Sequence, residues 1–154
     1  MNRGKSPTKN HTNPTEEPDT LGILDRSQNK LKSLEEIAGL LKKGLLDVNL
    51  SVNLLGSPSG LPNTIKQLNL SMNRFLTLRG FNCFPNLTSL DVSLNQLSSF
   101  EGLELPNLTY LNAASNNLNK LKGIERCRNI STLILNKNKL KSLSFSANNV
   151  NVDI

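Results

Sequence analysis

An eleven-residue pattern, L-x-x-L-x-L-x-x-N-x-L, recurs about six times after residue 20 and constrains the fold more than any other feature. The third occurrence, residues 65–75, has an apolar residue or asparagine at every fixed position, whereas the first has Arg26 at one aliphatic position. The asparagines are spaced by 24, 20, 22, 21 and 22 residues, at Asn29, Asn53, Asn73, Asn95, Asn116 and Asn138. Such regular recurrence predicts stacked copies of one structural unit.

The residue types within the pattern indicate what each unit contains. The segment x-L-x-L-x is typical of a short strand whose leucines face the core, because successive side chains of a strand point to opposite faces. The asparagine ends the strand, and its amide can bond backbone groups that leave the sheet and would otherwise lack partners. Stacked repeats then share one core and one ladder of asparagines.

The second half of each repeat identifies the class. After the asparagine, apolar residues follow at three-residue steps and glycine often comes next, as in Leu97, Phe100, Gly102 and Leu103. This resembles the 22-residue class of leucine-rich-repeat proteins, typified by the nuclear regulatory subunit of protein phosphatase 1, over about residues 21–143. The resemblance implies short helical or 3₁₀ turns on the convex side and a concave sheet that binds other proteins. The predicted fold class is an α/β leucine-rich-repeat solenoid, or horseshoe, with its parallel sheet on the concave side.

The two ends depart from the pattern. Residues 1–20 contain no large apolar side chain beyond Met1, so they are predicted to form a disordered tail before a repeat domain at 21–154. Within that tail, Ser6-Pro7 matches a proline-directed kinase site, and a chance Ser-Pro pair is the alternative. In the first repeat, Ser33 to Glu36 forms a capping-box pattern, which predicts an amphipathic α-helix over 33–43.

The pattern fades after Leu143, and alternating Val150, Val152 and Ile154 are suited to one last strand. No polar capping segment follows, although terminal repeats normally need one. We therefore expect the C-terminal cap to be incomplete or missing, as in a fragment, a truncated product or an isoform. Leucines such as Leu133, Leu135, Leu140 and Leu143 should then be partly uncovered.

The sequence gives little support to catalysis. The single histidine, His11, lies in the tail, so no nucleophile–base pair can be assembled in the repeats. Cys83 and Cys127 fit no metal spacing, lie too far apart for a disulfide, and are predicted to be buried thiols. We predict no enzyme, no metal, no cofactor and no small-molecule substrate.

The N-terminus lacks the apolar segment of a signal peptide, and no apolar run is long enough to span a bilayer. The expected location is the cytoplasm or nucleus, with no membrane partner. Five of the six N-x-S/T matches recur at fixed positions of the repeat, so they are interpreted as part of the repeat rather than as glycosylation sites.

The residues between the strand leucines are predicted to face outward and to form columns across the repeats. Three neighbouring apolar residues in one column, together with the only tyrosine, suggest a contact patch, although partial burial at the strand ends is an alternative. The candidate protein-binding residues of the concave face are Asp25, Asn49, Asn69, Asp91, Asn112, Ile134, Val52, Met72, Leu94 and Tyr110.

A second candidate is a basic patch over residues 120–141, which contain seven basic residues and a single acidic residue, Glu125. Its members are Lys120, Lys122, Arg126, Arg128, Lys137, Lys139 and Lys141. The patch favours an acidic protein partner, and a solvated flank without a role is the alternative. Aromatic residues make up only 4% of the chain, so stacking of nucleic-acid bases is poorly supported.

Three functions remain open at this stage. The leading one is a protein-binding scaffold or regulatory subunit, with phosphatase regulation as one option that the family offers. A cytoskeletal or ciliary structural component is the alternative, since the resemblance includes ciliary dynein and spliceosomal proteins. Association with nucleic acid is the weakest of the three.

Overall fold

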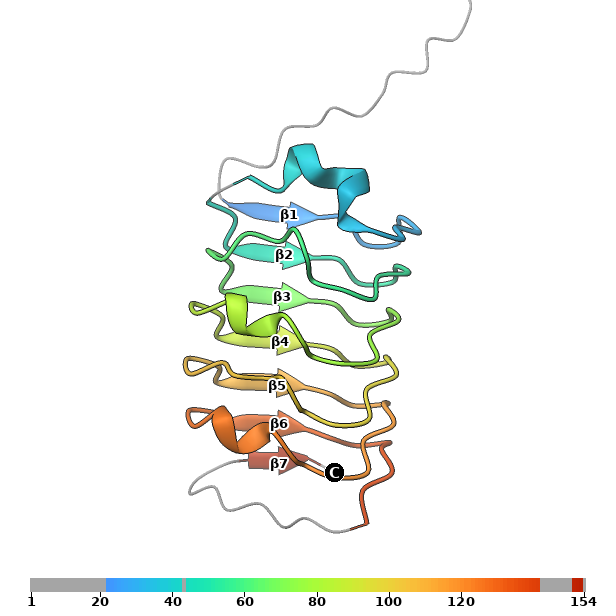
Figure 1. Ribbon diagram of the computed structural model, residues 1–154, viewed down its shortest axis with the longest axis vertical. Helices are drawn as coiled ribbons and strands as arrows, with labels where there is room; N and C mark the ends of the chain where they lie inside the picture. Colours follow the sequence, from blue (N-terminus) through green and yellow to red (C-terminus); the bar gives the residue numbers. More distant parts are fainter. Residues whose placement is uncertain (1–21, 43, 142–150, 154) are drawn as a thin grey trace, which may run out of the picture.

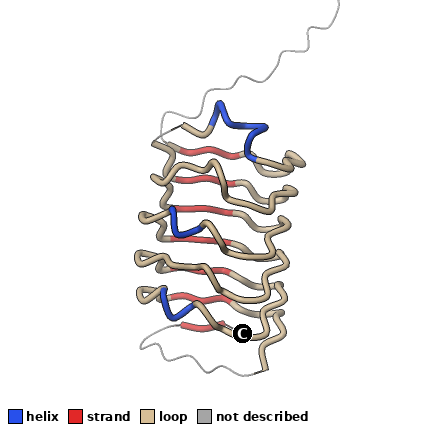
Figure 2. Tube along the Cα trace, in the orientation of Figure 1, coloured by secondary structure: helices blue, strands red, loops and turns tan. Residues whose placement is uncertain are grey.

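The computed structural model describes residues 22–42, 44–141 and 151–153. In that part of the chain, successive coils stack in sequence order into a solenoid (Figure 1). Each coil has a strand on one side and a return segment on the other, and the return segments lie along the opposite face from the sheet (Figure 2). The predicted disordered tail at residues 1–20 and Leu143 lie outside the described residues.

Within the described segments, seven three-residue strands form one parallel sheet in sequence order. They are β1 (Ile23–Asp25), β2 (Asp47–Asn49), β3 (Gln67–Asn69), β4 (Ser89–Asp91), β5 (Tyr110–Asn112), β6 (Thr132–Ile134) and β7 (Asn151–Asp153). The strands pair in register, so that Leu68 lies opposite Val48 on one side and Leu90 on the other. Equivalent positions of the repeats therefore form straight columns across the sheet, as the sequence pattern predicts.

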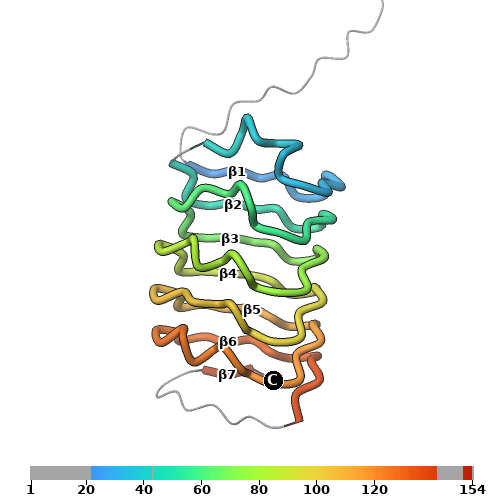
Figure 3. Tube along the Cα trace, in the orientation of Figure 1, coloured from blue at the N-terminus to red at the C-terminus, as the bar shows by residue number. Residues whose placement is uncertain are grey.

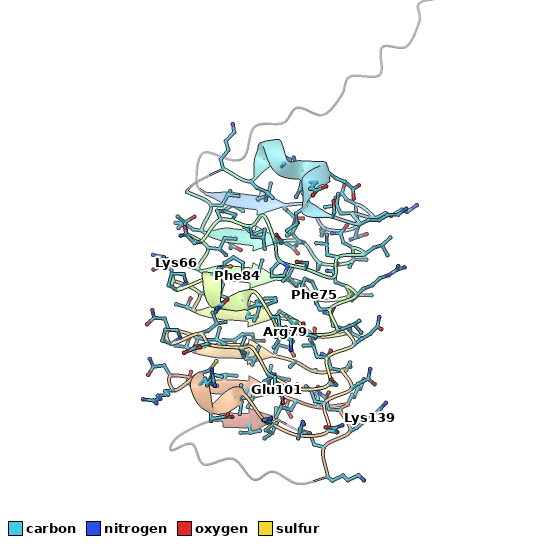
Figure 4. The ribbon with its side chains drawn as sticks, in the orientation of Figure 1. Lys66, Phe75, Arg79, Phe84, Glu101 and Lys139 are labelled. Carbon is cyan, nitrogen blue, oxygen red and sulfur yellow. The ribbon has the colours of Figure 1, made fainter. Side chains whose placement is uncertain are left out.

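The core is a stack of leucines closed by phenylalanines from the return segments. The side chains of Phe75, Phe81 and Phe84 are fully buried and meet edge to face, with ring centroids 5.8 and 5.9 Å apart. In Figure 4, Phe84 lies on the return side, and Phe75 lies nearer the edge where the strands end. Each repeat covers the apolar face of the next, which is why several are needed for a stable core.

The asparagine ladder is present and joins neighbouring repeats. Asn95 Nδ2 donates to the carbonyls of Leu70 and Val92 at 3.0 and 3.1 Å, and its Oδ1 accepts from the Phe75 N–H at 2.9 Å. Asn53, Asn73 and Asn116 are also buried and bond in the same way. Among the described residues, every buried side-chain nitrogen and oxygen has a partner.

Where the return segments are described, their helices are 3₁₀ and not α. They are η1 (Leu34–Leu40), η2 (Phe81–Cys83) and η3 (Ile124–Arg126). The prediction of an α-helix over 33–43 was wrong, because the segment closes i to i+3 bonds and is interrupted at Ile37, where φ is −124°. The capping interaction itself is present, since the Glu36 carboxylate accepts the Ser33 N–H at 2.9 Å.

A second ladder runs along the edge where the chain enters the strands. Asn107 Nδ2 donates to the Pro85 carbonyl at 2.8 Å, and Asn129 Nδ2 donates to the Pro106 carbonyl at 2.7 Å. The hydroxyl of Thr109, two residues after Asn107, donates to the Thr88 carbonyl at 3.1 Å. These N-x-S/T matches thus link neighbouring coils through both of their polar side chains.

Strand β7 lies at the C-terminal end of the stack and pairs with β6 in parallel (Figure 3). It confirms the expected last strand around Val152, which packs against the core, while Val150 and Ile154 lie outside the described residues. Leu133 and Leu135 are therefore buried, contrary to expectation, whereas Leu140 is partly buried as expected. No helix in the described segments has the length and apolar character needed to cross a membrane.

Candidate functional site

The central column of the sheet face consists of polar side chains that cap the strands. The side-chain oxygen of each accepts the N–H two residues later, as with Asp25 to Ser27 at 2.8 Å and Asn69 to Ser71 at 3.0 Å. This column contains Asp25, Asn49, Asn69, Asp91 and Asn112, and ends in Ile134. Five of the predicted binding residues therefore also have a structural role, which the sequence analysis did not foresee.

Two carboxylates in this column are held by neighbouring amides. Asn49 Nδ2 donates to Asp25 Oδ2 at 2.9 Å, and Asn112 Nδ2 donates to Asp91 Oδ2 at 3.0 Å. The backbone N–H of Ser27 contributes most to lowering the pKa of Asp25 below its usual value, so this carboxyl stays ionised near neutral pH. The central column is consequently polar, with fixed negative charge at β1 and β4.

The next exposed column holds the predicted apolar patch. Val52, Met72 and Leu94 are 38%, 48% and 51% exposed, so each is partly buried and still presents apolar surface to solvent. Each has a positive φ, between 54° and 57°, as do the equivalent residues in the other repeats. The backbone turns away from the sheet at this point and directs these side chains toward solvent.

Tyr110 lies on the same face, at the start of β5. It is partly buried, and both its desolvation and the nearby charge of Asp91 raise the pKa of its hydroxyl. Between Tyr110 and the apolar column lies a column of small residues, Ser51, Ser71, Ser93 and Ala114.

The seven basic residues do not form one surface. Lys120 and Lys122 both contact Glu101 on the return side, with Nζ–Oε1 distances of 3.9 and 2.9 Å. Arg126 pairs with Glu104 at 3.4 Å beside a shallow depression also lined by Arg128. Lys139 instead lies at the edge where the strands end (Figure 4).

Lys137 and Lys141 belong to the same short segment as Lys139, and all three are exposed. The ion pairs found within the described residues involve Glu101 and Glu104 only, so this lysine group is separate from the paired cations. The predicted basic patch therefore divides into three ion-paired cations on the return segments, with Arg128 beside them, and a lysine group at the strand-end edge.

The two cysteines differ from each other. Cys127 is buried, as predicted, and desolvation raises the pKa of its thiol. Cys83 is exposed, so the prediction of burial was wrong for this residue. It lies at the end of η2, and its thiol contacts the Gly80 carbonyl at 2.8 Å instead of entering the core.

Comparison with known proteins supports the repeat fold. No family model matches the chain. A calmodulin-binding receptor kinase of Arabidopsis thaliana, CaMRLK, is 37% identical over 92 residues, which are 55% of this chain and 14% of that protein. The chain therefore spans a small part of this relative.

Among solved structures, an internalin C2 from Listeria monocytogenes superposes with a TM-score of 0.60 and 20% identity, over 86% of this chain and 79% of that one. A second Listeria internalin (inlF) gives 0.55 and 21%, over 71% of this chain and 39% of its own. A leucine-rich-repeat protein of Leptospira interrogans gives 0.56 and 26%, over 73% and 36%. These likenesses show that the fold is that of a leucine-rich-repeat protein.

Proposed function

We propose that this chain is a protein-binding scaffold or regulatory subunit that holds a partner on its concave face, and that it is not an enzyme. The observation that carries the proposal is the exposed apolar column of Val52, Met72 and Leu94 beside small polar columns. The fixed positions of the repeats are used to build the core and the ladders. The variable positions on the sheet face are therefore available for a partner, and exposed apolar side chains grouped there favour protein contact.

The finer assignment rests on the repeat class that the sequence resembles. We propose regulation of a phosphatase as the first specific role to test, with a cytoskeletal or ciliary role as the alternative. The proposed location is the cytoplasm or nucleus. The small share of aromatic residues and the pairing of three basic side chains with glutamates favour a protein partner over nucleic acid.

Affinity capture from cell extract, read out by mass spectrometry, tests this proposal when two matched variants are compared. Gln67→Lys with Tyr110→Lys adds two charges to the sheet face, and Ala38→Lys with Asn82→Lys adds two charges to the 3₁₀ helices opposite. We expect partners held by the wild type to be lost with the first variant and kept with the second. Equal capture by both variants would contradict a binding site on the concave face.

A further inference from the structure

One edge of the solenoid, where the strands end, has an uneven distribution of exposed side chains. We call it the asparagine edge and define it by the residues one before, one after and three after each ladder asparagine. These positions are exposed or partly exposed, because the asparagine and the apolar residue two places after it point inward. In repeats 2 to 4 its members are Val52, Leu54, Gly56, Met72, Arg74, Leu76, Leu94, Gln96 and Ser98, and its basic members toward the two ends include Lys30, Lys137, Lys139 and Lys141.

The middle of the asparagine edge is apolar. Val52, Met72, Leu94 and Leu76 are 38%, 48%, 51% and 60% exposed. They are four of the six large hydrophobic side chains that are exposed within the described residues, and the other two lie near the opposite ends of the strands. Repeats 2 to 4 therefore gather most of the exposed apolar surface at one edge.

The ends of this edge are basic. Lys30 stands at the first repeat, and the lysine group of residues 137, 139 and 141 stands at the sixth. None of the positions that define the edge carries a carboxylate, and Arg74 adds a positive charge within the apolar part. Lys32 also belongs to the edge, but the Glu36 carboxylate lies close to it and partly offsets its charge.

The backbone along the edge is already bonded. The Val52 N–H donates to the Ser71 carbonyl at 2.9 Å, and the Met72 N–H donates to the Ser93 carbonyl at 2.9 Å. The Arg74 N–H likewise donates to the Leu55 carbonyl at 2.8 Å. A partner here cannot add as a strand, so side-chain packing and charge must hold it.

We propose that the asparagine edge binds a linear segment of a partner protein with apolar residues in its centre and acidic residues at both ends. Neighbouring strands lie about 4.8 Å apart, so the first and sixth repeats are separated by roughly 24 Å. A helix with a rise of about 1.5 Å per residue covers this length in roughly 16 residues, and an extended segment needs about seven. The segment's apolar centre packs on repeats 2 to 4, and its carboxylates meet the lysines at the ends. This inference rests on the proposed function and specifies the kind of partner that the face accepts.

Selection from a library of random 16-residue peptides displayed on phage tests the proposal with the whole chain as target. We expect enriched peptides to have an apolar centre with Asp or Glu on both sides. We also expect their Kd to weaken at least tenfold between 50 and 500 mM salt, because the exposed charges are screened. Enrichment of uncharged or basic peptides, or of none, would overturn the proposal.

Two variants locate the site. The triple change Val52→Asn, Met72→Asn and Leu94→Asn removes the apolar centre, and asparagine tolerates the positive φ of all three positions. Lys137→Glu with Lys139→Glu reverses charge at one end, whereas Lys66→Glu with Arg128→Glu makes the same change of charge elsewhere. We expect the first two variants to weaken peptide binding at least tenfold and the third to leave it within twofold. Equal loss in both charge variants would contradict a site at this edge.

Three further measurements separate the possible occupants. Analytical sedimentation shows whether a second copy of the chain binds instead. A wild-type dimer that becomes monomeric in the asparagine triple variant would overturn the proposal. Displacement of the peptide by a single-stranded oligonucleotide at a similar concentration would do the same. If affinity capture depends on Gln67 and Tyr110 but not on the edge, the proposed function stands and the inference fails. If capture depends neither on Gln67 and Tyr110 nor on the asparagine edge, while the peptide still binds that edge, the proposed function fails and the peptide-binding edge remains.

Discussion

At the scale of single residues, the ladder asparagine supplies hydrogen bonds that the backbone cannot make. Each repeat leaves its strand after three residues, and the carbonyls and N–H groups of the turn are then buried without sheet partners. The Asn95 side chain meets three of these groups, in its own repeat and in the one before. Its loss leaves buried polar groups unsatisfied, which costs more than the bonds alone contribute.

The first prediction compares two members of the ladder. Asn95→Ala should lower the free energy of unfolding by about 1–3 kcal/mol, because it leaves buried backbone groups without partners. Asn29→Ala should change it much less, since Asn29 is exposed and, among the described residues, its amide donates only to the Ser27 carbonyl in the same repeat. Urea denaturation followed by circular dichroism measures both. Equal losses at the two positions would contradict a role that depends on burial.

A second residue-scale prediction concerns Val52, a β-branched residue held at φ 57°. Valine is strained in this left-handed region, whereas asparagine adopts it readily. Val52→Asn should therefore raise the free energy of unfolding by about 1 kcal/mol, within the 1–3 kcal/mol typical of such strain. Val52→Ile keeps the β-branch and should show no gain. A melting temperature that falls with asparagine would mean that contacts of the valine outweigh its strain.

At the scale of elements, the strands were predictable and the return segments were only partly so. Leucines at alternate positions all point to one face only when the segment is a strand. Because these leucines recur at a nearly constant spacing, they also predict which residues of β2 to β6 lie opposite one another. The apolar residues of 34–41 fit both helix types, and the choice depends on how far the chain must travel. A 3₁₀ helix rises about 2.0 Å per residue against 1.5 Å in an α-helix, so it spans the coil with fewer residues.

The features that the sequence analysis missed depend on positions that the pattern leaves free. Met72 and Leu94 have a positive φ although neither is glycine or asparagine, the residues that usually indicate one. The surrounding turn imposes this angle, so the residue type did not predict it. The exposure of Cys83 depends on the direction in which η2 leaves the core. The outward columns, by contrast, could be predicted because they follow directly from the alternation of the strands.

The third prediction concerns the turn before η3. Gly123 has φ 104°, and a Cβ placed there would lie 2.3 Å from the Phe100 carbonyl oxygen in the preceding coil. Gly123→Ala should therefore destabilise the fold by more than about 1 kcal/mol, through both strain and displacement of the neighbouring coil. Gly39→Ala is the matched control, because nothing lies within 4 Å of its added methyl group. Thermal unfolding of the two variants should differ in midpoint, and equal midpoints would argue against this close contact.

At the scale of the whole molecule, each described strand contacts only the strands before and after it in sequence. Stability in such an array is approximately a sum of repeat terms and neighbour terms, so the ends are held by one interface and the centre by two. A partner segment along the asparagine edge would contact several repeats at once. Its binding would connect coils that otherwise interact only in pairs.

The last prediction measures this difference between centre and ends. Equivalent backbone N–H groups in successive repeats make nearly identical bonds, at 2.8 Å for Leu70 to Asp91, 2.8 Å for Val92 to Asn112 and 2.7 Å for Leu135 to Asp153. Differences in their hydrogen exchange therefore report position in the stack and not bond geometry. We expect Leu70 and Val92 to exchange most slowly, and Leu135, together with Arg26 at the other end, to exchange fastest. Equal protection at all four would show that the neighbour terms are strong enough to make the solenoid open as one cooperative unit.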